Sequence, residues 1–321
     1  MARLDFVLKT ASPWLVYGAD PRHQPELRAA SIRGQLRYWL RALVGARTTD
    51  LSEVWKQETA VFGSTGSASP VSVHMLPQKL RKDDIRKVDM LPHRSGEKGS
   101  RSPSPKAEAL RTDVEIHLHF LTRPGVDYFP QEFAPALSLW LLLGGVGKRS
   151  RRMFGAPYVK RVKVQPETLL SENWWAEPPK TQERFIDILR DRLAYYLPND
   201  KLASGLTVPS FPTLHPRHSW IIVGRKQFTD YEEANRALFS LLRSKTYQPY
   251  SDYFGFVKGS DRRASPLIAQ VRQLGDGCYP VLTYLRSRPY PRHVDWDIVN
   301  RFMKDAIDKF NAETAWGGPF K

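Results

Sequence analysis

Residues 143–155 read LGGVGKRSRRMFG, and this stretch organises the elements on either side of it. The apolar residues at 133–143 have helical spacing, and the glycines predict that this helix ends here, because a helix C-terminus often needs a residue at positive φ. No acid lies between positions 132 and 167. Since glycine lets a backbone approach closely, the loop is suited to hold a polyanion among four cations: Lys148, Arg149, Arg151 and Arg152.

Nucleotide-binding motifs do not fit this loop. A P-loop requires glycine where Leu142 stands and Ser or Thr where Arg149 stands, and the dinucleotide fingerprint requires glycine at Ser150. Both motifs also follow a strand, whereas this loop follows a predicted helix. A mononucleotide site is therefore not expected here. A plain helix C-cap with a solvated basic turn stays open, since cations are favoured at helix C-termini.

Composition indicates an anionic partner. The chain has 49 Lys and Arg against 33 Asp and Glu, a net charge of +16, which favours nucleic acid first and a membrane surface second. The lone Cys278 argues against disulfides and cysteine zinc sites. The longest apolar run is too short to span a bilayer, and the start lacks a signal-peptide pattern. We expect a cytoplasmic protein with no cofactor, metal, membrane or small-molecule substrate.

The first half has the ferredoxin-like order. Alternating patterns predict strands at 3–9, 70–76, 112–123 and 158–164, and helical spacing predicts helices at 32–44, 52–62 and 133–143. The order β-α-(α)-β-β-α-β is also that of the RNA-recognition module, although its aromatic signature is absent. Ser31 is the expected N-cap of the first helix. The charged, Ser-Pro-rich residues 79–111 are predicted to form a flexible insertion.

The second half is predicted to be a weaker copy. A helix is expected around 185–197 and a strand at 219–223. Asp230 and Asp295 are the expected N-caps of two later helices, and a hairpin is expected at 267–286. The order is β-α-β-β-α. We therefore predict an α+β chain of two tandem ferredoxin-like (RRM-like) domains with inserted loops, at residues 1–165 and 166–321.

The first predicted helix carries a basic stripe. Arg33, Arg37 and Arg41 are each four residues apart, so they lie on one side of the helix, beside its apolar face. No acid occurs between positions 26 and 50. Three arginines on a rigid helix are well placed to hold successive phosphates, although a solvated basic face is the alternative interpretation.

Three motifs together resemble the RAMP superfamily of CRISPR-associated proteins. They are SIRGQLRYWLRAL at 31–43, GGVGKRSRRMFG at 144–155 and RRASPL at 262–267. Within that superfamily the chain most resembles the first subunit of the Cmr (type III-B) effector complex. The resemblance covers both halves and the spacing between the motifs. It departs at Met153, where the family usually has glycine, so the loop is expected to be stiffer there.

The resemblance implies a non-catalytic role in defence against foreign nucleic acid. It implies a subunit near the 3′ end of the guide RNA, with guide RNA, target RNA and other RAMP subunits as partners. We predict an RNA-binding groove between the two halves, with Tyr38 and Phe154 stacking on bases. The candidate residues are cations and aromatics: Arg28, Arg33, Arg37, Tyr38, Arg41, Lys148, Arg149, Arg151, Arg152, Phe154, Lys160, Lys258, Arg262 and Arg263.

A metal-independent RAMP endoribonuclease that processes precursor guide RNA is the main alternative. Such cleavage needs a general base near the 2′-hydroxyl, usually histidine. The candidates are His23, His215 and His218. His117 and His119 share a strand face at a spacing that suits a metal, but no Cys or carboxylate cluster completes that site.

A third possibility is a pure assembly role. Aromatic segments at 14–17, 174–175 and 316–320 have the composition of interface anchors. Burial in the core is the competing interpretation, and we favour it for Trp39 and Trp140, which lie on the apolar faces of predicted helices.

Overall fold

The computed structural model describes most of the chain. The described residues are 1–20, 24–76, 80–90, 104–165, 175, 177–205, 208–258, 261–275, 277–288 and 294–321. At 256–258 and 261–263 the backbone is described and the side chains are not.

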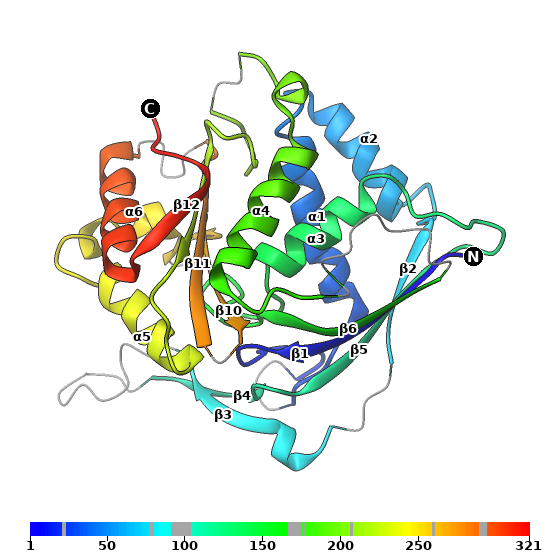
Figure 1. Ribbon diagram of the computed structural model, residues 1–321, viewed down its shortest axis with the longest axis horizontal. Helices are drawn as coiled ribbons and strands as arrows, with labels where there is room; N and C mark the ends of the chain where they lie inside the picture. The colour runs from blue at the N-terminus through cyan, green and yellow to red at the C-terminus, as the bar shows by residue number, and fades with distance from the viewer. Residues whose placement is uncertain are drawn as a thin grey trace.

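The N-terminal sheet has the strand order β2-β5-β1-β6, with antiparallel neighbours. Its elements are β1 Arg3–Thr10, α1 Ala29–Val44, α2 Leu51–Phe62, β2 Val71–Met75, β5 Glu115–Thr122, α3 Phe133–Leu143 and β6 Pro157–Gln165. Leu4, Phe6 and Leu8 alternate along β1 and are buried in one core with α1 and α3. Figure 1 shows α1 and α3 together on one face of this sheet. The expected ferredoxin-like order is confirmed.

The C-terminal sheet repeats this order as β10-β11-β7-β12. Its elements are β7 Ser219–Gly224, α5 Tyr231–Leu242, β10 Leu267–Leu274, β11 Gly277–Leu285, α6 Trp296–Phe310 and β12 Ala312–Gly317. Strand β12, which the sequence did not predict, completes the second copy. Helices α5 and α6 cover one face, and α4, at Gln182–Tyr196, lies on the other (Figure 1). The chain is thus an α+β protein with two antiparallel sheets.

Two of the three predicted N-cap residues cap their helices, and the third does not. Asp230 accepts a hydrogen bond from the Glu233 backbone N at 2.8 Å, and Asp295 caps α6 by accepting from the Asp297 N. Ser31 does not cap α1, so that prediction was wrong. The helix begins at Ala29, with Arg28 at the N-cap position and no side-chain cap.

The insertion at 79–111 is not wholly irregular, contrary to expectation. It contains η1 Lys82–Asp84 and a pair of antiparallel strands, β3 Ile85–Asp89 and β4 Lys106–Leu110. Residues 91–103 lie outside the described part. Three apolar side chains of the pair are buried in the second core: Val88, Ala107 and Ala109. Charged residues fill the exposed positions of these short strands, so the sequence showed no periodicity there.

The two halves share a core. Phe185 of α4 is buried with Ile221 and Val223 of β7 in the same apolar cluster as α1 and α3. The remaining short elements are η5 Asn199–Lys201, η6 Gln248–Phe254, β8 Phe256–Lys258 and β9 Asp261–Arg263. Because this core crosses the halves, the boundary at 165/166 stays a prediction. Within the described ranges, no helix combines the length and the apolar character that crossing a membrane requires.

Several tryptophans belong to this interior. Trp39 and Trp140 are fully buried, which confirms the core interpretation for both. Trp14 and Trp175 are also buried, so they pack inside the fold instead of forming surface anchors. Trp174 lies outside the described residues, and Trp316 on β12 is only partly buried.

Candidate nucleic-acid interface

The three sequence motifs meet at Arg151. This residue lies in the arginine loop, residues 144–155, between α3 and β6. Its guanidinium carbon is 4.8 Å from the centroid of the Tyr38 ring on α1. Its Nη1 donates a hydrogen bond to the carbonyl of Ser265, which follows β9. The helix motif, the loop motif and the second-half motif therefore converge on one place, at the junction of the two halves.

The arginine loop docks on β10, an edge strand of the second sheet. The Met153 N donates to the Ala269 carbonyl at 2.8 Å, and the Ala269 N donates to the Arg151 carbonyl at 3.3 Å. These bonds form a short parallel bridge between Arg152 and Ala269. The loop thereby continues the sheet at its edge and fixes the two halves to each other.

A buried arginine that sequence reasoning missed supports the same junction. The Arg272 side chain on β10 donates to the carbonyls of Leu142 at 2.7 Å and Gly144 at 2.8 Å. These carbonyls lie at the C-terminal end of α3, where helical partners are lacking. Burial lowers the pKa of Arg272 to about 9, so the side chain is charged near neutral pH. An arginine inside a strand without other charged residues was the available signal.

Positive φ angles give the loop its shape. Gly147 has φ +85° and Gly155 has φ +77°. A Cβ added at Gly155 would lie 1.9 Å from the Val146 carbonyl oxygen, so only glycine fits there. Met153 has φ +62° and is fully buried. Its backbone thus occupies the conformation that suits the glycine usual in the family, and its side chain ties the loop to the second core.

Arg152 acts as a clamp within this junction. Its Nη1 donates to the Ser265 Oγ at 2.8 Å and to the Leu267 carbonyl at 3.0 Å, and its Nη2 donates to the Phe254 carbonyl. Burial, together with the neighbouring arginines, lowers its pKa to about 9. With its donors directed at protein carbonyls, Arg152 is a structural residue at the base of the loop.

Three other loop cations are closer to solvent. Lys148 is exposed, with its Nζ 5.4 Å from the Tyr17 ring centroid. The Arg149 guanidinium lies 5.7 Å from the Phe239 ring centroid, and burial followed by repulsion from Arg243 lowers its pKa to about 10. Among the described residues, no carboxylate forms an ion pair with a loop cation. This uncompensated charge favours the approach of an anion.

The α1 stripe is partly neutralised, which the sequence did not predict. Glu58 of α2 lies 2.9 Å from the Arg37 Nη1 and 3.6 Å from the Arg41 Nε. Arg33 and Arg37 also donate to the Phe62 carbonyl at the end of α2. The absence of acids near the stripe in sequence did not exclude an acid from another helix. Arg41, with 48% of its side chain exposed, remains accessible to a ligand.

The two aromatics expected to stack on bases differ in access. Phe154 is fully buried, with its ring centroid 5.8 Å from that of Tyr231, so the stacking role predicted for it does not fit this structure. Tyr38 is partly buried, and Arg151 covers its ring. The contacts that the cluster offers are therefore mainly electrostatic.

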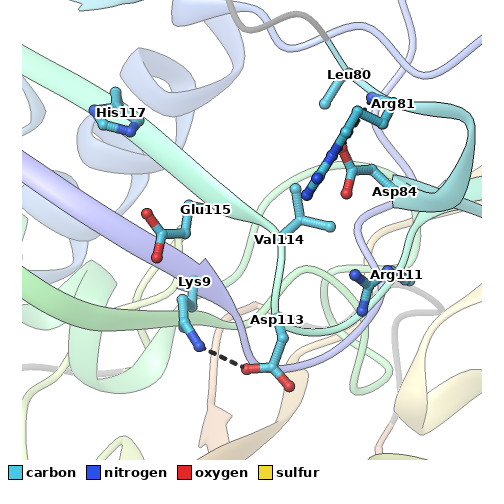
Figure 2. A pocket seen from close by; sticks show the side chains of 9 residues that line it. All are labelled: Lys9, Leu80, Arg81, Asp84, Arg111, Asp113, Val114, Glu115 and His117. Atoms are coloured by element: carbon cyan, nitrogen blue, oxygen red, sulfur yellow. Dashed lines mark hydrogen bonds and ion pairs between the residues drawn. The ribbon is translucent and has the colours of Figure 1, made fainter.

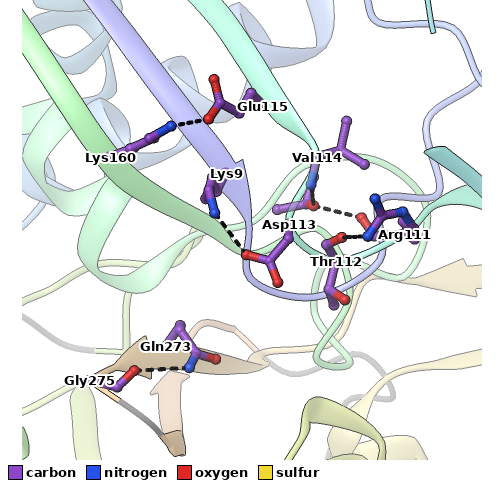
Figure 3. Close-up of polar contacts among 10 residues, drawn as sticks. Lys9, Arg111, Thr112, Asp113, Val114, Glu115, Lys160, Gln273 and Gly275 are labelled. Atoms are coloured by element: carbon purple, nitrogen blue, oxygen red, sulfur yellow. Dashed lines mark hydrogen bonds and ion pairs between the residues drawn. The ribbon is translucent and has the colours of Figure 1, made fainter. Parts of the chain in front are cut away.

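Other candidates lie outside the cluster or outside its description. Lys160 on β6 forms an ion pair with Glu115, as Figure 3 shows beside the Lys9–Asp113 pair. Arg28 lies at the start of α1, 3.8 Å from Glu26. Three further candidates belong to the β8–β9 pair, whose side chains are not described: Lys258, Arg262 and Arg263.

A polar pocket of about 400 Å³ lies on the N-terminal half (Figure 2). His117 lines it with Lys9, Arg81 and Arg111, and so do three carboxylates: Asp84, Asp113 and Glu115. Because its charges are mixed, this pocket should attract a polyanion less than the uncompensated cations of the arginine loop.

The candidate histidines that the structure describes are poorly accessible to an RNA strand. His119 Nδ1 bonds to Asp5, and its Nε2 is buried. His215 and His218 are buried, and burial followed by repulsion from His218 lowers the pKa of His215. His23 lies outside the described residues. Within the part of the chain that the structure describes, no group of three or more His, Cys, Asp or Glu could hold a metal ion.

Comparisons with known proteins agree with this architecture. Residues 7–158 match the model of the RAMP superfamily. The chain is 26% identical over 329 aligned residues to the CRISPR system Cmr subunit Cmr1-1 of Pyrococcus furiosus, covering 92% of this chain and 93% of that protein. The crystal structure of apo Cmr1 from Pyrococcus furiosus matches with a TM-score of 0.66 and 21% identity, over 99% of this chain and 100% of that one. A chain of the type III-B Cmr-beta complex bound to cognate target RNA matches with a TM-score of 0.63 and 12% identity, over 96% and 99%.

Proposed function

We propose that this chain, whose residues 7–158 match the model of the RAMP superfamily, is an RNA-binding subunit of a type III-B Cmr effector complex. In that complex it holds the 3′ region of the guide RNA, the guide–target duplex, or both, beside other RAMP subunits. Its Pyrococcus furiosus relative is named as a Cmr subunit, and one protein of similar fold belongs to a Cmr complex bound to cognate target RNA. Both support the proposal.

The unpaired charge of the arginine loop is the observation that carries the proposal. Lys148, Arg149 and Arg151 lie on a loop in which no described carboxylate forms an ion pair with a cation. Arg151 contacts Tyr38 on α1, the helix that also carries the half-exposed Arg41. Arginine binds phosphate oxygens through a planar fork of donors, and such contacts position an RNA backbone without reading its sequence.

We propose a non-catalytic role for the chain. A metal-independent ribonuclease requires a histidine beside the RNA. His215 and His218, the described candidates for this base, are buried and lie away from the arginine loop, so neither is placed to act on a strand bound at that loop.

RNA binding at several salt concentrations tests the proposal. Fluorescence anisotropy would compare the wild type with Arg41→Ala/Lys148→Ala, which removes two accessible cations and leaves Arg152 in place. For each lost contact, the slope of log affinity against log salt should fall by about 0.7 with single-stranded RNA and by about 0.9 if the guide–target duplex behaves like B-form DNA. The RNA should stay intact during the measurement.

Lys304→Ala/Lys309→Ala is the matched control. Both lysines are exposed on α6, which lies on the outer face of the second sheet (Figure 1). This variant should bind RNA as the wild type does. An equal loss of slope in both double variants would mean that binding reflects only net charge, and the proposed interface would be wrong. RNA cleavage that a histidine substitution abolishes would support the ribonuclease instead.

A further inference from the structure

A pocket of about 870 Å³ lies at the end of β12, apart from the arginine loop. Three cationic side chains line it: Arg217, Arg286 and Lys321. His218 and Trp316 also contribute, and no carboxylate side chain is among the described lining residues. A concave site with one flat aromatic wall and three cationic side chains suits a ligand that is both planar and anionic.

A β-bulge sets the orientation of Trp316. Thr314 pairs with Ile222 of β7, but Trp316 pairs with Ile221, so Ala315 is an extra residue in the strand. The bulge turns Trp316 away from the face where the Thr314 Oγ1 accepts the Trp220 Nε1. The Trp316 Nε1 donates to the Leu214 carbonyl at 2.8 Å, which fixes the ring where it lines the pocket.

The cations of the pocket have different roles. Arg286 is nearly buried, stacks 4.2 Å from the Trp296 ring centroid and donates to the Lys321 carbonyl at 2.7 Å. It forms a fixed positive wall. Arg217 is exposed, and within the described residues no carboxylate forms an ion pair with it. Its side chain is therefore free to reach a ligand at the pocket rim.

Backbone hydrogen bonds link segments beside the pocket to α1 and to the segment that contacts the arginine loop. The Leu214 N donates to the Ala42 carbonyl at 2.8 Å, and Ala42 follows Arg41 on α1. On the other side, the Leu285 N donates to the carbonyl of Pro266, next to Ser265, which binds Arg151 and Arg152. These hydrogen bonds fix the position of the pocket relative to α1 and to the segment that holds the arginine loop.

We propose that this pocket accepts one nucleotide of a single-stranded RNA segment, with the base against Trp316 and a phosphate at Arg217. An indole stacks on any base, and arginine pairs with the phosphate of the same nucleotide. This inference rests on the proposed RNA-binding function but uses a different set of residues. It adds a single-strand subsite to an interface that otherwise contacts the backbone.

Photocrosslinking tests the subsite. A short oligoribonucleotide containing 4-thiouridine would be bound to the full chain, irradiated and mapped by mass spectrometry. We expect a crosslinked peptide that contains Trp316. Affinity for the same oligomer should fall about tenfold in Trp316→Leu and remain near wild type in Trp316→Phe, because phenylalanine keeps a ring for stacking. Arg217→Ala should weaken binding, and Lys304→Ala should not.

The readouts separate this inference from the proposed function. Trp316→Leu should keep the salt slope of the wild type, because its phosphate contacts at the arginine loop remain, and circular dichroism would verify its fold. Crosslinks confined to α1 and the arginine loop, with wild-type affinity in Arg217→Ala, would overturn the subsite and leave the proposed function standing. Loss of affinity in Trp316→Phe equal to that in Trp316→Leu would also overturn it, since stacking would then not explain the effect.

Discussion

The Nε of Arg272 lies 2.7 Å from the carbonyl oxygen of Leu142, across the junction between the two sheets. The same guanidinium reaches Gly144, the first glycine of the arginine loop. The guanidinium of a residue in the second half thus donates hydrogen bonds to the carbonyls at the C-terminal end of a helix in the first half. The position of the arginine loop therefore depends on a residue that is itself too deeply buried to contact a ligand.

Replacing Arg272 should destabilise the protein strongly. Arg272→Met keeps the bulk but leaves two buried carbonyls without donors, so we expect a loss of about 3 kcal/mol in the free energy of unfolding. Arg272→Lys should recover little, because an ammonium group cannot reproduce the fork of donors. Urea unfolding measures both. Exposed Arg184→Ala on α4 is the control, and an equal loss there would contradict the capping role.

A second prediction concerns Gly155. Gly155→Ala places a Cβ 1.9 Å from the Val146 carbonyl at φ +77°, so we expect a loss of about 3 kcal/mol or failure to fold. Gly34→Ala is the matched control, since its Cβ on α1 meets nothing within 4 Å. It should stabilise the protein by about 0.5–1 kcal/mol. Thermal unfolding would distinguish the two, and similar melting temperatures would refute the argument.

The elements that the sequence predicted correctly have an uninterrupted pattern of apolar residues along their whole length. The alternation in β1 and the helical spacing in α1 fix both their type and their buried face, and the order of such elements predicts the ferredoxin-like topology. β12 was missed because its bulge interrupts the alternation at Ala315. β3 and β4 were missed because each is short and carries charges at its exposed positions.

The sequence indicated which segments form the candidate site, but not which of their side chains are free to contact a ligand. The three motifs that resemble the RAMP superfamily are the segments that meet at Arg151. The sequence could not separate Arg152, whose donors bond to carbonyls, from Lys148, which is exposed. Nor could it show that Glu58 from another helix pairs with Arg37. Both facts depend on contacts between residues distant in the chain.

Glu58 should weaken RNA binding in the wild type. Glu58→Gln removes one negative charge beside Arg37 and Arg41 while keeping an oxygen that Arg37 can bond. We expect RNA affinity at low salt to rise roughly threefold, and the gain to shrink at high salt because ions screen it. Glu53→Gln, a more exposed acid on the same helix, should change affinity less. An equal gain in both variants would assign the effect to net charge alone.

RNA affinity should be nearly independent of pH around neutrality. An arginine is charged below its pKa, and burial followed by repulsion from Arg243 lowers the pKa of Arg149 only to about 10. Its charge, and its contact with phosphate, should therefore persist through neutral pH and be lost only as the pH rises through that value. Anisotropy measured between about pH 6 and pH 8 should show a change of roughly twofold at most.

Replacing Arg149 with histidine should make RNA affinity depend on pH near neutrality, and this change tests whether residue 149 contacts RNA. Arg149→His places an imidazole where the phosphate is expected, and the burial and the repulsion from Arg243 that act on Arg149 should lower its pKa below the usual value of about 6.5. Affinity should therefore approach that of the wild type at low pH and be lost as the pH rises toward neutrality. Lys304→His, on the outer face of the second sheet, should not introduce this dependence. A wild type that itself loses affinity steeply between about pH 6 and pH 8 would show that histidines, and not the arginine loop, provide the main contact with RNA.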